Sequence, residues 1–110
     1  MAVEGASRRD PFDALGDPNR RAIVSLLRGG DRSVRELAEA LPISRPAVSR
    51  HLRLLKEAGL VRDRREGTRS LYRLHGEGFE EVRTYLEEVW GDASARFRLA
   101  AENTSKRTGR

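Results

Sequence analysis

Hydrogen-bonding side chains gather just after a short turn, Leu41-Pro42-Ile43. A serine follows this turn, and Val48, Leu52 and Leu55 recur at helical spacing, which leaves the polar side chains on a different face of the predicted helix. Arginine donates paired hydrogen bonds to guanine or phosphate, and serine hydroxyls bond to either. The second helix of a helix-turn-helix lies in the major groove of DNA. The residues expected to contact DNA here are Ser44, Arg45, Pro46, Ser49, Arg50, His51 and Arg53.

The charges along the chain are segregated by sign. The 110 residues hold 22 Lys and Arg against 17 Asp and Glu, a net charge of +5, and 20 of the basic residues are Arg. Residues 45–73 hold nine basic and three acidic side chains, whereas residues 77–92 hold six acidic and one basic. A solvated surface with no polyanionic partner usually mixes the signs. The basic segment therefore favours nucleic-acid binding over a plain helical hairpin with a solvated face.

Two short runs of strand-forming residues follow Gly59, at 60–65 and 69–74, with Glu66-Gly67-Thr68 between them. Gly67 can supply the positive φ that a tight turn needs, so we expect a β-hairpin. Its arginines would lie along the DNA backbone or enter the minor groove, as those of a wing do. A surface hairpin kept soluble by its charge is the alternative. The wing residues expected at DNA are Arg62, Arg64, Arg65, Thr68 and Arg69.

Other kinds of site find little support in the sequence. The chain has no cysteine, which excludes disulfides, thiolate metal sites and cysteine nucleophiles, and only two histidines, His51 and His75. Because arginines surround His51 and would repel a metal ion, we expect it to contact DNA; His75 suits a capping or surface role. No serine, histidine and carboxylate are spaced as a triad, and no glycine-rich phosphate loop is present. We therefore expect no enzyme activity, metal or cofactor.

Well-marked helix ends punctuate the chain. Asp10-Pro11 and Asp17-Pro18 are typical helix starts, whereas Gly16 and Gly29-Gly30 are typical ends. Ser33-Val34-Arg35-Glu36 is a capping box that opens the first helix of the helix-turn-helix. Helices, then a hairpin, then a long helix predict a mainly α (α+β) fold, a winged helix-turn-helix with an added C-terminal helix.

A chain of this length is expected to fold as a single domain. No run of more than three apolar residues occurs, so we expect no membrane span and a cytoplasmic protein. The expected boundaries are a tail at 1–9, one domain at 10–102 made of a helix-turn-helix (33–58), a wing (60–74) and a C-terminal helix (78–101), and a tail at 103–110.

The predicted C-terminal helix carries apolar residues at a spacing of three or four. Because a core of this size cannot cover so long a stripe, we expect it to pack on a second copy, although intrachain packing is an alternative. Tyr85, Trp90 and Phe97 could also line a ligand pocket between protomers, but packing is the simpler use. A two-fold dimer would need a near-palindromic DNA site. The expected interface residues are Phe12, Leu15, Phe79, Val82, Leu86, Val89, Trp90, Ala93 and Phe97.

Several segments of the chain together resemble ArsR-type (arsenic-repressor-like) winged-helix regulators. They are residues 34–38 (VRELA), 44–52 (SRPAVSRHL), 58–61 (AGLV), 66–69 (EGTR) and 72–74 (YRL). The resemblance implies a homodimer formed by the first and last helices, and a repressor that blocks a promoter, often its own. Metal-sensing members carry cysteines in the helix matching residues 34–41, or His/Asp sets in the last helix. This chain has neither, which indicates a metal-independent branch whose inducer is unknown.

Two functions of different classes follow from these patterns. The first is a sequence-specific DNA-binding regulator, more simply a repressor because repression needs only occlusion of the promoter. The second is a protein-interaction module whose basic face binds nucleic acid without specificity. Loss of discrimination between DNA sites on replacement of Arg45 and Arg50 would favour the first, and uniform weakening the second.

Overall fold

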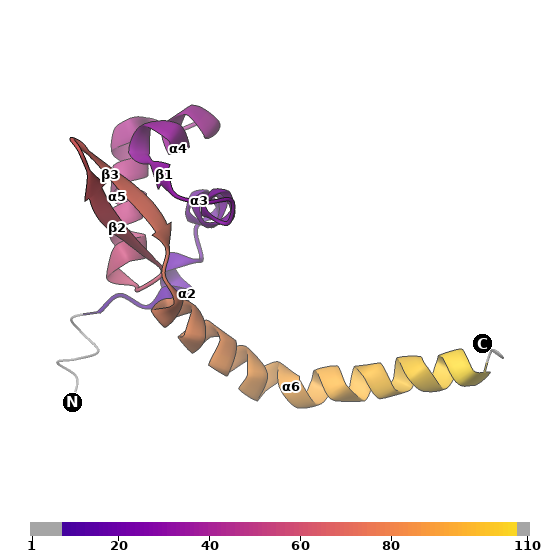
Figure 1. The fold of residues 1–110 in the computed structure, drawn as a ribbon. Coiled ribbons are helices and arrows are strands. Elements are labelled where there is room, and N and C mark those ends of the chain that lie inside the picture. The colour runs from indigo at the N-terminus through magenta and orange to yellow at the C-terminus, as the bar shows by residue number, and fades with distance from the viewer. Residues whose placement is uncertain (1–7, 108–110) are drawn as a thin grey trace. The chain divides into compact units, whose positions relative to one another are not determined.

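The structure is a computed structural model that describes residues 8–107, with the backbone alone for 92–100 and 102–107. The chain divides into two compact units, the first ending at Glu80 and the second beginning at Glu81. The last helix runs through this division. The elements in order are α2 (Pro11–Ala14), α3 (Pro18–Leu27), β1 (Arg32–Ser33), α4 (Val34–Ala40), α5 (Arg45–Glu57), β2 (Val61–Glu66), β3 (Arg69–Leu74) and α6 (Gly76–Arg107) (Figure 1).

Side chains cap the N-termini of α2, α3, α4 and α5. Asp10 accepts a hydrogen bond from the backbone N–H of Phe12 at 2.9 Å, and Asp17 accepts one from Asn19 at 2.8 Å. Ser33 forms the predicted capping box at the start of α4, and Ser44 accepts from the third residue of α5 at 3.2 Å. Each cap satisfies a backbone donor that the helix itself leaves unpaired. The predicted starts of these four helices are confirmed.

The hairpin is a two-residue one. Strands β2 and β3 pair antiparallel with Glu66 opposite Arg69, so that only Gly67 and Thr68 lie in the turn. Gly67 has a φ of 66°, as the turn requires. The first strand therefore spans Val61–Glu66 rather than 60–65, because Glu66 joins the ladder opposite Arg69.

A third strand, β1, was not expected from the sequence. Its two residues pair with β3, Arg32 opposite Tyr72 and Ser33 opposite Leu71, and the sheet has the order β1-β3-β2. A strand of two residues shows no alternation of polar and apolar side chains, so its sequence carries no signal. The fold is the winged helix-turn-helix that was predicted, with a three-stranded sheet.

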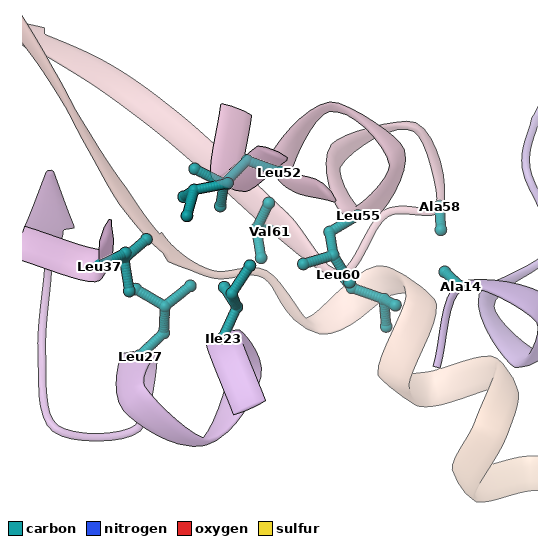
Figure 2. Close-up of a cluster of buried hydrophobic side chains, with 10 residues drawn as sticks. Ala14, Ile23, Leu27, Leu37, Leu52, Leu55, Ala58, Leu60 and Val61 are labelled. Atoms are coloured by element: carbon teal, nitrogen blue, oxygen red, sulfur yellow. The ribbon is translucent and has the colours of Figure 1, made fainter. Parts of the chain in front are cut away.

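The core of the first unit lies between the helices and the start of the hairpin. Figure 2 shows its side chains turned toward one another, with contributions from α3, α4, α5 and β2. Full burial of an aliphatic side chain is worth about 1.5–3 kcal/mol, so this cluster is the main source of stability. The largest fully buried side chains are Ile23, Leu37, Val48, Leu52, Leu55, Leu60 and Val61.

The last helix is longer than predicted at both ends. It begins at Gly76 rather than residue 78, and it continues to Arg107 rather than ending at 101, so residues 103–107 are helical and not a tail. No Gly or Pro occurs between residues 92 and 108, and without a stop signal the helix continues.

The predicted N-terminal tail, residues 1–9, lies mostly outside the described part of the chain, which begins at residue 8. Within it, Arg9 donates its backbone N–H to the carbonyl of Glu57 at 3.3 Å. In the described residues, no helix has an apolar stretch long enough to cross a membrane.

Two glycines allow the start of α6 to approach the turn that follows α5. Gly59 has a φ of 74°, and its carbonyl accepts a hydrogen bond from the N–H of Gly78 at 2.8 Å. A Cβ on Gly78 would collide with the carbonyl oxygen of Ala58 and come within 2.9 Å of Cδ2 of Leu60. The Ala58 carbonyl is backbone and cannot turn aside.

We expect Gly78→Ala to lower the free energy of unfolding by about 1–3 kcal/mol, because overpacking forces the backbone apart. Gly76→Ala is the matched control in the same helical turn, since its Cβ would meet no atom within 4 Å. Urea unfolding followed by circular dichroism measures both variants. Equal stability of the two would contradict the close approach.

Candidate nucleic-acid interface

Helix α5 divides its residues between the core and the surface. Val48, Leu52 and Leu55 are fully buried. The polar residues at its start and along its outer face are exposed, and α4 packs against it to complete the helix-turn-helix. The expected DNA-contacting residues that this places on the exposed surface are Ser44, Arg45, Pro46, Ser49, Arg50 and Arg53.

Two of these arginines have no counterion in the protein. Within the described residues, neither Arg45 nor Arg50 has a hydrogen-bond or ion-pair partner. Arg53 lies 4.0 Å from Glu57, one turn further along α5. An exposed pair of this kind contributes little to stability and is readily exchanged for another anion. The exposed face of α5 therefore offers guanidinium groups that are available to a ligand.

The wing combines free and paired arginines. Arg62 and Arg65 are exposed and have no partner in the described part of the chain. Arg64 pairs with Asp31 at 3.3 Å and with Glu66 at 3.4 Å, and Arg69 pairs with Glu66 at 3.5 Å. Arg62 and Arg65 are thus the wing arginines most available to phosphate.

Three ion pairs fix the wing on the rest of the first unit. Asp31, just before β1, accepts hydrogen bonds from Arg64 of β2 and from Nε of Arg73 of β3, both at 3.3 Å. Lys56 of α5 lies 2.7 Å from Asp63 of β2, and this hydrogen bond raises the pKa of the Lys56 ammonium. The partners of Asp31 are 33 and 42 residues away in sequence, and nothing in the local pattern identifies them.

His51 lies apart from the exposed set with which the sequence grouped it. Its Nδ1 is 3.4 Å from Nη1 of Arg20 in α3, and Nε of Arg20 donates to the carbonyl of Ala14 at 2.6 Å. His51 is half-buried between α5 and α3, and its expected contact with DNA stays a prediction. Positions 48, 51, 52 and 55 follow the spacing of a helix face, and that spacing was the signal for its inward position.

The surroundings of His51 disfavour its charged form. Burial is the largest cause and lowers the pKa of the imidazole, Arg20 and Arg50 lower it further, and Asp17 opposes them. The pKa in the folded protein therefore lies below its ordinary value of 6.5. Between these two values the unfolded chain binds more protons than the folded one, so stability is lost as the pH falls through this window.

We expect the free energy of unfolding of the wild type to fall more steeply between about pH 7.5 and 5.5 than that of His51→Gln, which has no proton to bind there. Urea unfolding at a series of pH values measures the difference. His75→Gln controls for loss of an imidazole at the end of the hairpin. Parallel curves for the wild type and His51→Gln would show that His51 carries no such linkage.

The residues expected at a dimer interface fall into three groups. Phe12 and, in the second unit, Leu86, Val89 and Trp90 are between 41% and 59% exposed. Leu15 and Phe79 instead pack against the core of the first unit, and Val82 is half-buried. The side chains of Ala93 and Phe97 lie outside the described residues.

Comparisons with known proteins give one consistent picture. A family model described as "Bacterial regulatory protein, arsR family" matches residues 17–63, which run from the start of α3 into β2. The chain is 52% identical over 79 residues to the HTH-type transcriptional regulator Rv2034 of Mycobacterium tuberculosis, covering 72% of this chain and 74% of that protein. It is 44% identical over 64 residues to the transcriptional repressor SdpR of Bacillus subtilis, covering 58% of this chain and 71% of SdpR.

The fold has close counterparts among solved structures. The ArsR-like transcriptional regulator from Rhodococcus sp. RHA1 matches with a TM-score of 0.70 and 30% identity, over 96% of this chain and 94% of the other. The two sequence relatives and this structure are all named as regulators of transcription, and none of these names describes an enzyme.

Proposed function

The chain belongs to the ArsR family of bacterial regulatory proteins and is a DNA-binding regulator of transcription, and from this premise we propose a homodimeric repressor that binds a near-palindromic operator. Repression requires only that the bound protein occlude a promoter, and the similar SdpR is named a repressor. We propose that the operator lies upstream of the gene for this protein, and that the protein acts in the bacterial cytoplasm, where the chromosome lies.

The observation that carries this proposal is the set of arginines without counterions on α5 and the wing. Arg45 and Arg50 project from the helix that enters the major groove in this motif, where a guanidinium can bond two acceptors of guanine. Arg62 and Arg65 project from the wing, where they suit the phosphate backbone. We assign Ser44 and Ser49 to phosphate or base edges beside these arginines.

Replacement of Arg45 and Arg50 by Ala is expected to remove discrimination between DNA sites, at about 1–3 kcal/mol for each lost base contact. Fluorescence anisotropy at about 150 mM salt would compare DNA from upstream of the gene with shuffled DNA of equal composition. Arg83→Ala removes one positive charge from α6, a helix that carries no proposed base contact, and it should preserve discrimination. Equal weakening on both DNAs would favour the protein-interaction module instead.

We further propose that DNA binding is independent of metal ions. The sequence has no cysteine, and in the described residues no three His, Asp or Glu side chains come together as ligands. Tight metal sites in proteins need three or four such donors. Repeating the same titration with a chelator or with added zinc tests this, because a metal-responsive repressor would change its affinity.

The proposed dimer rests on the apolar residues that α6 exposes. Leu86, Val89 and Trp90 are more than half exposed in the second unit. Their spacing of three and four residues places them on one face of the helix. Exposed apolar clusters of this kind mark interfaces between proteins. A second copy of α6 is the partner with matching geometry under two-fold symmetry.

We expect Val89→Glu to convert the dimer into a monomer, because it places an uncompensated charge in the apolar contact. Size-exclusion chromatography with light scattering measures the mass directly. Thr84→Glu adds the same charge at an exposed position outside the apolar set and should leave the dimer intact. A monomeric wild type would refute the dimer.

A further inference from the structure

A hollow of about 410 Å³ lies between the wing and the starts of α4 and α5, and it joins expected DNA contacts to side chains that had no assigned role. Its basic lining comes from four separate elements, α4, α5, β2 and β3, and no carboxylate of the described residues belongs to the lining. Arg35 of α4 is among these residues, although no pattern in the sequence assigned it to a site. The side chains that could bind a ligand are Arg35, Arg45, Arg65, Thr68, Arg69 and Ser70.

The four guanidinium groups around the hollow are poorly neutralised by the protein itself. Arg45 and Arg65 have no ion-pair partner in the described chain. Arg35 pairs with Glu39 at 3.3 Å and Arg69 with Glu66 at 3.5 Å, and both pairs are exposed. Such pairs are weak and exchange readily for a stronger anion. Like charges held together in this way repel one another until an anion from outside joins them.

The chemistry of the lining suits phosphate, because four guanidinium groups and two hydroxyls together offer donors to several oxygens. Guanidinium groups bind phosphate oxygens through paired hydrogen bonds, and hydroxyls such as those of Thr68 and Ser70 add single donors. The hollow is much larger than one phosphate group and falls within the range of small-molecule sites, about 300–1,000 Å³. A phosphate that carries an organic group therefore fits better than a bare inorganic ion.

We propose that this hollow is a pocket for a phosphate ester. The ester is either a nucleotide unit of the DNA backbone or a free phosphorylated small molecule. The first source rests on the proposed function and makes Arg35 a phosphate contact of the regulator. The second makes the pocket an effector site, because a free ester bound to Arg45 and Arg65 would compete with DNA for the same side chains.

The first arm of the test measures how DNA affinity depends on salt. Each phosphate contact contributes about 0.9 to the slope of log affinity against log salt. We expect Arg35→Ala to lower that slope by about 0.9–1, and Arg35→Lys to retain most of it because the charge remains. Arg83→Ala is the control of equal charge on α6. Arg35 is exposed, so its replacement should leave the fold intact.

The second arm titrates the full chain with ribose 5-phosphate at constant ionic strength, with ribose as the control. We expect the arginine Nε–H signals of Arg45 and Arg65 to shift in NMR spectra with ribose 5-phosphate and not with ribose. A changed slope alone assigns the pocket to the DNA backbone, and shifted signals alone assign it to a free ester. Either outcome supports the pocket.

An unchanged slope together with unshifted signals would overturn the pocket. If the wild type still prefers its upstream DNA to shuffled DNA in that case, the proposed regulator stands without it. If the wild type shows no such preference but Arg35→Ala lowers the slope or the ester shifts the signals, the proposed operator binding fails and the pocket stands.

Discussion

Helix α5 must bury one face and leave another open to DNA, and the rest of the first unit is built around this constraint. Its buried residues, Val48, Leu52 and Leu55, are fully enclosed, and α2, α3, α4 and β2 all contact it. Burial of these three side chains holds the helix in one rotation about its axis, because any turn would expose apolar surface at about 25 cal/mol per Å². The same rotation directs Ser49 and Arg50 outward. The core therefore sets which residues can meet a base edge.

The wing depends on a different kind of interaction. Asp31 joins both strands of the hairpin to the chain before β1, and Lys56 joins β2 to the end of α5. Asp31 and Asp63 have side chains about a fifth exposed, 23% and 20%, so their pairs are better shielded from solvent than the surface pairs on α4 or α6. These pairs orient the wing relative to α5. Orientation matters here because both elements must meet a single duplex at once.

The elements of the fold were predictable wherever their causes are local. Asp17 and Ser33 cap helices through hydrogen bonds that reach two or three residues ahead, so the residue types alone reveal the helix starts. Strand β1 was not predictable, because its pairing partner lies about 40 residues further along the chain. Within the site, the exposed arginines were predictable from the excess of basic residues in this part of the sequence and from the helical spacing of the apolar residues beside them. The inward position of His51 was missed because the basic residues around it suggested an exposed face, although its helical spacing matches that of the buried residues. Arg35 was missed because only the folded chain brings α4 against the wing.

The basic residues of α5 and the wing include two groups with opposite uses. Lys56, Arg64 and Arg73 are held by Asp63 and Asp31, and they position the wing. Arg45 and Arg65 have no such partners in the described chain, and the acids that could reach the wing are already engaged. Self-repulsion among the free group costs energy in the unbound protein and is relieved when a polyanion binds. Because the acids that fix the wing are the same acids that would otherwise neutralise it, the geometry of the proposed DNA-binding surface and the affinity for phosphate proposed for it would arise from one distribution of charge.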